Sequence, residues 1–80
     1  MPFPTLDEVV QQLREIAEDD TIGPDSRLTS LDIDSLDVME WVFEIETSAG
    51  VRIKDELYAK GALEGATVGD FYERVRDTTA

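Results

Sequence analysis

The chain has 80 residues, no Cys, no His and a net charge of −12 from 19 acidic and 7 basic residues. This length predicts one domain, residues 1–80, with a modest core. The missing residue types exclude disulfides, thiolate nucleophiles, Cys/His zinc sites and a histidine general base, and we expect neither a catalytic residue nor a metal site. Such an acidic chain should repel nucleic acid and anionic lipid surfaces and attract proteins with basic docking faces.

The bulk pattern is that of a folded domain, and we expect a monomer. Hydrophobic residues make up 41% of the chain and recur periodically, which is not the composition of a disordered acidic tail. No segment is long and apolar enough to span a membrane. Residues Met1 to Thr5 lack the basic and apolar regions of a signal peptide, so we expect a cytoplasmic location.

The first expected element is a helix over about 5–18. Thr5 and Glu8 have the spacing of a capping box, and apolar residues follow at helical intervals. A long connection then covers residues 19–34, with turn residues at its centre. Its scattered apolar side chains should hold this loop on the core: Ile22, Leu28, Leu31 and Ile33.

The second helix is expected over 35–49. Asp34 is a suitable N-cap, Asp37 lies in the first turn where the helix dipole favours an acid, and Gly50 is a suitable C-terminal residue. The helix should therefore begin directly after the long loop.

The remaining third of the chain predicts one short and one longer helix. Residues 51–53 form an extended connection, and a short helix covers 55–60 and ends at Gly61. A capped start at Thr67 opens a last helix that runs to about residue 77. The predicted fold is an all-α four-helix bundle, with three longer helices, one short helix and a long loop between helices 1 and 2.

Ser35 is the first candidate site residue, because it falls in the first turn of the second helix. Backbone N–H groups are unpaired there and the helix dipole is positive, so a phosphate ester on the hydroxyl would be stabilised. A serine at this position is more often an ordinary helix-start residue, so the surroundings of Ser35 carry the interpretation.

Those surroundings are acidic. Six acids and no Lys or Arg lie between Leu31 and Gly50: Asp32, Asp34, Asp37, Glu40, Glu44 and Glu46. Asp37, Glu40 and Glu44 share one side of the predicted helix with Thr47 and Ser48. Surface helices usually mix charge signs, so this one-sided face suggests docking to basic partners.

The apolar residues of this helix divide into two groups. Val38, Trp41, Val42 and Ile45 are placed to enter the core. Three more lie at the border of the acidic face. Leu36 and Met39 should be partly exposed and contact partners, whereas Phe43 is expected in the core.

Three features together resemble the acyl carrier protein family of phosphopantetheine-bearing domains. The first is Asp34-Ser35-Leu36 at the start of the second helix. The second is the set of acids on that helix: Asp37, Glu40, Glu44 and Glu46. The third is Thr67-Val68-Gly69-Asp70, which opens the last helix. Length, acidity and helix order are similar to the family over nearly the whole chain.

This resemblance implies that Ser35 receives a 4'-phosphopantetheine arm from coenzyme A. Acyl groups would be carried as thioesters on the sulfur of the arm, so that a chain without Cys takes part in thiol chemistry. The protein would be a non-catalytic carrier, and partner enzymes would read the surface formed by the matching acids with Leu36 and Met39. The implied partners are a phosphopantetheinyl transferase and acyl-processing enzymes with basic docking faces, such as an acyltransferase or a ketosynthase.

Departures from the family pattern bear on the pathway. Asp32 replaces the usual Gly ahead of Asp-Ser-Leu, Lys54 stands near a position where Pro is common, and the 55–66 stretch is long. These features favour a dedicated pathway, such as polyketide synthesis, over bulk fatty acid synthesis. A peptidyl or aminoacyl carrier of a nonribosomal system is the alternative.

Two other classes fit less well. A calcium-binding EF-hand counted from Asp32 would have Leu36, Asp37 and Phe43 at positions that require an acid, a Gly and a Glu. An acidic regulatory interaction protein is compatible with the charge, but it provides no reason for Asp-Ser-Leu at a helix start.

Overall fold

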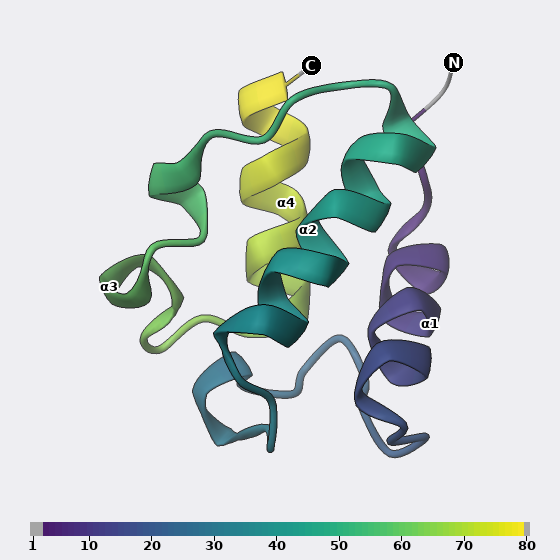
Figure 1. Ribbon diagram of the computed structural model, residues 1–80, viewed down its shortest axis with the longest axis vertical. Coiled ribbons are helices and arrows are strands. Elements are labelled where there is room, and N and C mark those ends of the chain that lie inside the picture. The colour runs from purple at the N-terminus through teal and green to yellow at the C-terminus, as the bar shows by residue number, and fades with distance from the viewer. Residues whose placement is uncertain (1–2, 80) are drawn as a thin grey trace.

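The computed structural model describes residues 3–79, which form an all-α bundle as predicted. Its α-helices are α1 (Leu6–Ala17), α2 (Ser35–Ala49), α3 (Lys60–Leu63) and α4 (Val68–Thr79), with 3₁₀ turns η1 (Leu28–Ser30) and η2 (Asp55–Leu57). In Figure 1, α2 and α4 lie in the middle, with α1 on one side and the short α3 on the other. Within the described residues, no helix has the length and apolarity needed to cross a membrane.

The ends of α1 and α2 are set by the residues that the sequence indicates. Thr5 caps α1, because its hydroxyl oxygen accepts a hydrogen bond from the Glu8 amide at 3.2 Å. This is one half of the predicted capping box. Helix α2 ends at Gly50, whose φ of 69° lies in the left-handed region that glycine adopts without strain. The predicted bounds of both helices are confirmed to within one residue.

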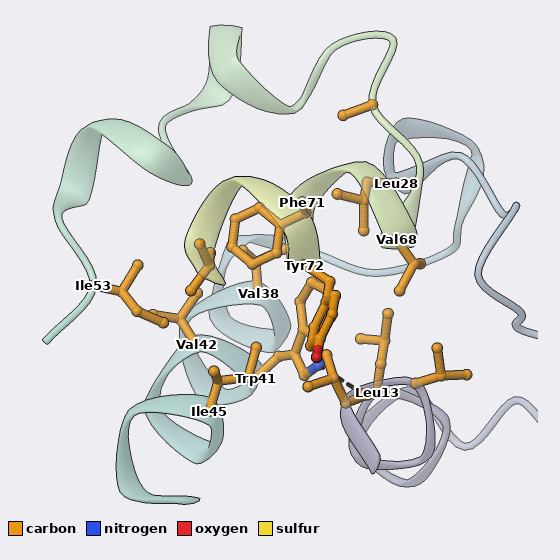
Figure 2. Close-up of a cluster of buried hydrophobic side chains, with 14 of the residues drawn as sticks. Leu13, Leu28, Val38, Trp41, Val42, Ile45, Ile53, Val68, Phe71 and Tyr72 are labelled. Carbon is orange, nitrogen blue, oxygen red and sulfur yellow. Dashed lines mark hydrogen bonds between the residues drawn. The ribbon is translucent and has the colours of Figure 1, made fainter. Parts of the chain in front are cut away.

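The core lies between α1, α2 and α4 (Figure 2). Trp41 is fully buried, its ring centroid lies 5.0 Å from that of Phe71, and its indole N–H donates to the Val9 carbonyl oxygen at 3.0 Å. The indole therefore joins α2 to α4 by packing and to α1 by a hydrogen bond. The four core residues predicted on α2 are all buried: Val38, Trp41, Val42 and Ile45.

The long loop between α1 and α2 is held on the core, as expected. Ile22 and Leu28 are buried, and Leu31 and Ile33 pack partly buried against the core. The start of α4 adds a backbone contact, since the Gly69 amide donates to the Pro24 carbonyl oxygen at 2.8 Å. A Cβ at residue 69 would lie 3.2 Å from that oxygen, so this close approach favours glycine.

The segment before α4 differs from the prediction of one short helix over 55–60. The chain forms η2 first, leaves the helical conformation at Tyr58 and Ala59, and begins α3 only at Lys60. Ala59 is extended, with ψ of 153°, and Gly61 lies inside α3 rather than at its end. The predicted bounds of this helix were therefore wrong, because the backbone is extended at Ala59, inside the predicted range, and Gly61 does not end a helix.

Candidate functional site

Ser35 is the first residue of α2, and its side chain is exposed. The two acids around it form a reciprocal capping box: the Asp37 amide donates to Asp34 Oδ1 at 2.9 Å, and the Asp34 amide donates to Asp37 Oδ2 at 3.3 Å. The predicted N-cap role of Asp34 is thus confirmed. Each carboxylate is tied to the backbone, so the box braces the turn that presents the Ser35 hydroxyl.

The backbone N–H groups of Ser35 and Leu36, in the first turn of α2, indicate that an anion could bind there. The Asp37 amide is capped by Asp34, and the Val38 amide donates to the Asp34 carbonyl oxygen at 3.1 Å. Within residues 3–79, the amides of Ser35 and Leu36 have no hydrogen-bond acceptor. Free amides at the positive end of a 15-residue helix favour an anion bound to the Ser35 oxygen.

A cavity of about 540 Å³ opens beside Ser35, and we call it the Ser35 cavity. Its lining comes from η1, the loop before α2, the first turns of α2, and residues 58–63: Leu28, Thr29, Ile33, Asp34, Ser35, Val38, Met39, Tyr58 and Leu63. The lining is mostly apolar with a few polar groups, and its volume lies in the range of small-molecule sites, about 300–1,000 Å³. A group attached to Ser35 therefore has an adjoining cavity to enter.

An apolar stripe runs along the exposed side of α2. Leu36, Met39 and Phe43 are 71%, 55% and 67% exposed. The prediction that Phe43 enters the core was wrong, because Val38, Trp41, Val42 and Ile45 already fill the core-facing arc. The spacing could have revealed this, since seven residues make almost two full turns and place Phe43 above Leu36. We call these three residues and the acids beside them, Glu40 and Glu44, the α2 outer face.

The acids predicted to form one docking surface have different surroundings. Glu40 and Glu44 are exposed, whereas Asp37 is half-buried in the capping box. Glu46 is also half-buried, and its Oε2 accepts a hydrogen bond from the Ile53 amide at 2.7 Å. Ser48, expected on the acidic side, instead accepts from Gln12 Nε2 of α1 at 2.9 Å. In the described part of the chain, no three acids are arranged to hold a metal ion.

Comparison with known families decides the identity. The family model of the phosphopantetheine attachment site, PP-binding, matches residues 4–75, which run from the start of α1 almost to the end of α4. The chain belongs to this family. No curated protein and no solved structure showed significant similarity to the chain.

The prosthetic group of a phosphopantetheine attachment domain is 4'-phosphopantetheine, and domains of this family are carriers rather than catalysts. The residues around Ser35 fit such a group. The hydroxyl is exposed for esterification, two free amides lie at the helix start, and the Ser35 cavity adjoins them. Sequence reasoning missed Tyr58 as part of this site, because no spacing relates a residue of the 54–65 segment to the start of α2.

Proposed function

We propose that the chain carries acyl groups as thioesters on a phosphopantetheine arm attached to the Ser35 hydroxyl. The observation that carries the proposal is the place of that hydroxyl, exposed at the first residue of α2 beside two unpaired amides. Ser30 is also exposed, but it lies in a three-residue 3₁₀ turn without such a helix end. Ser35 is therefore the serine whose phosphate ester this fold would stabilise.

The attachment step is a phosphoryl transfer from coenzyme A. The Ser35 oxygen forms a new bond to the phosphorus that bears pantetheine, the pyrophosphate bond breaks, and adenosine 3',5'-bisphosphate leaves. The hydroxyl proton passes to a base on the transferase. This chain supplies the nucleophilic oxygen and the amides of Ser35 and Leu36, which stabilise the negative charge of the resulting diester.

Incubation with coenzyme A and a promiscuous phosphopantetheinyl transferase tests the site. Intact mass should rise by one arm in the wild type and in Ser30→Ala, and it should not rise in Ser35→Ala. An arm found on Ser35→Ala, or no arm on the wild type with several transferases, would refute the assignment of Ser35.

We also propose that partner enzymes dock on the α2 outer face. An apolar stripe with acids at its edge fits a partner pocket that is apolar inside and basic at its rim, and the acids would steer association. Phe43 joins Leu36 and Met39 in this role, because it is equally exposed. Asp37 and Glu46 belong to the proposed surface less directly, since their carboxylates hold backbone amides.

Charge reversal tests the docking surface. Glu44→Lys should slow acyl transfer from a partner enzyme several-fold at low salt without changing the fold, because exposed acids contribute little stability. Glu73→Lys makes the same charge change on an exposed residue of α4 and serves as the control. Equal rates for both variants would refute the proposed face.

The proposal also concerns the biosynthetic pathway that the carrier serves. A dedicated system, such as polyketide synthesis, is supported by the departures at Asp32 and Lys54. The mass of the cargo on protein isolated from its host separates an acyl carrier from an aminoacyl carrier, because an amino acid adds a basic nitrogen that an acyl group lacks.

A further inference from the structure

Among the described residues that line the Ser35 cavity, Tyr58 is the only aromatic one. Like Leu63, it comes from the segment between α2 and α4. It is half-buried and follows directly on η2. The other large lining residues are flexible or branched aliphatic side chains: Leu28, Ile33, Met39 and Leu63. An aromatic ring is rigid, so its position affects the shape of the cavity more than theirs.

The ring of Tyr58 is held in place by its own turn. Its hydroxyl donates to Asp55 Oδ1 at 2.7 Å, across the three residues of η2. This hydrogen bond raises the pKa of the Tyr58 hydroxyl, and burial and the negative charges of Asp55 and Glu46 act in the same direction. The phenol therefore stays protonated and bonded at neutral pH.

The charges near the ring bear on which cargo the cavity can hold. A neutral hydrocarbon group would gain from the apolar lining, whereas a free carboxylate would lose its hydration and lie near Asp34 and Asp55. None of the described side chains of the lining is a Lys or Arg.

We propose that Tyr58 is the residue that sets which acyl group the Ser35 cavity accepts, with Asp55 as the positioning residue that holds its ring. The preferred cargo is a neutral, apolar acyl chain up to a length limited by the ring. A chain that ends in a carboxylate stays in solvent. This inference rests on the proposed function, because the cargo reaches the cavity only when the arm is on Ser35.

The test loads the purified protein with acyl-pantetheine from acyl-coenzyme A of increasing chain length. Intact mass first confirms the arm. Two readouts then follow: the rate at which hydroxylamine cleaves the thioester, and the amide chemical shifts of Leu63 and Val38. A cargo in the cavity should be cleaved several-fold more slowly than acetyl and should shift both amides. An adipoyl cargo should behave like acetyl, although it has as many carbons as hexanoyl.

Substitutions of Tyr58 should change the longest acyl chain that the cavity protects, in either direction. Tyr58→Ala should extend protection to longer chains, and Tyr58→Trp should restrict it to shorter ones. Glu56→Ala changes an exposed residue of the same turn that does not line the cavity, and it should leave the profile unchanged. Asp55→Ala removes the acceptor of the Tyr58 hydroxyl and should broaden the length limit. It should also lower the pKa of that hydroxyl towards its ordinary value, which a merely structural role in η2 would not require.

The outcomes distinguish a failure of this inference from a failure of the proposed function on which it rests. If no arm attaches to Ser35, the proposed function fails and this inference with it. If the arm attaches but the chain-length profile is the same in wild type, Tyr58→Ala and Tyr58→Trp, the role of Tyr58 alone is overturned. Equal protection of adipoyl and hexanoyl would overturn the preference for neutral cargo.

Discussion

The two walls of the Ser35 cavity are built in different ways. The wall from η1 and α2 is anchored in the core, because Leu28 and Val38 are 3% and 8% exposed and α2 continues into the fully buried Trp41. The wall from residues 54–65 has no buried residue among its described side chains. It rests on partly buried Leu57, Tyr58 and Leu63, and Arg74 of α4 donates to the Ala62 carbonyl oxygen at 2.8 Å.

This difference teaches how a small domain can combine a fixed attachment point with an adaptable site. On the proposed function, every partner enzyme would need Ser35 in one geometry, and Ser35 lies on the wall that is anchored in the core. The 54–65 wall, which the proposed cargo would contact, has no buried residue among its described side chains and is stabilised by hydrogen bonds of Tyr58 and Arg74. Regions of this kind open at a lower free energy than the core.

The largest expected effect on the free energy of unfolding comes from the core that anchors the η1 and α2 wall. Trp41→Ala should lower the free energy of unfolding by about 3–5 kcal/mol, because it removes a large core side chain and leaves the Val9 carbonyl without its indole donor. Leu63→Ala, on the other wall, should cost about 1 kcal/mol, since its side chain is only partly buried. Denaturant unfolding measures both, and similar losses would contradict the contrast between the walls.

The second effect concerns the cap that presents Ser35. Asp34→Ala should destabilise the protein by about 1 kcal/mol, because the Asp37 amide loses its acceptor. Asp32→Ala changes an exposed acid outside the capping box and is the control. Chemical denaturation at neutral pH compares them; if Asp32→Ala cost as much, the cap would not be the cause.

A smaller effect should appear on the 54–65 wall. Arg74→Ala should change global stability by no more than about 0.5 kcal/mol, as for most surface substitutions. It should nevertheless speed hydrogen exchange of amides in α3, because the Ala62 carbonyl loses its partner. Arg76→Ala, on the same helix but over the Tyr72 ring, should leave that exchange unchanged. Faster exchange throughout α2 as well would mean that the two walls open together.

The smallest effect is a pH dependence of the same wall. The pKa of the Tyr58 hydroxyl is raised in the folded state, chiefly by the hydrogen bond to Asp55. The stability that this hydrogen bond contributes is therefore fully present below the pKa of an unfolded Tyr, about 10. It is lost as the pH rises through the higher pKa of the folded state. The difference in unfolding free energy between wild type and Tyr58→Phe should shrink over that alkaline range. A difference that stays constant there would show that the hydrogen bond contributes nothing.

Sequence reasoning reached the part of the site that lies on one helix. Asp34, Ser35 and Asp37 are neighbours in the chain, and capping chemistry relates them at fixed spacing, so their arrangement could be read directly. The misplacement of Phe43 had another cause. Hydrophobicity alone predicts burial of Phe43, but the core accommodates only five apolar side chains of that helix: Val38, Trp41, Val42, Ile45 and Ala49.

What the sequence by itself determined is the local structure: where α1, α2 and α4 begin, which side of α2 enters the core, and which serine stands at a helix start. Caps and helical periodicity act over three to seven residues, so they are written in consecutive letters. Only the tertiary structure decided that Tyr58 and Leu63 close a cavity against Val38 and Met39, and that Glu46 holds the Ile53 amide. Those contacts join segments through the packing of the whole chain, and no local spacing specifies them.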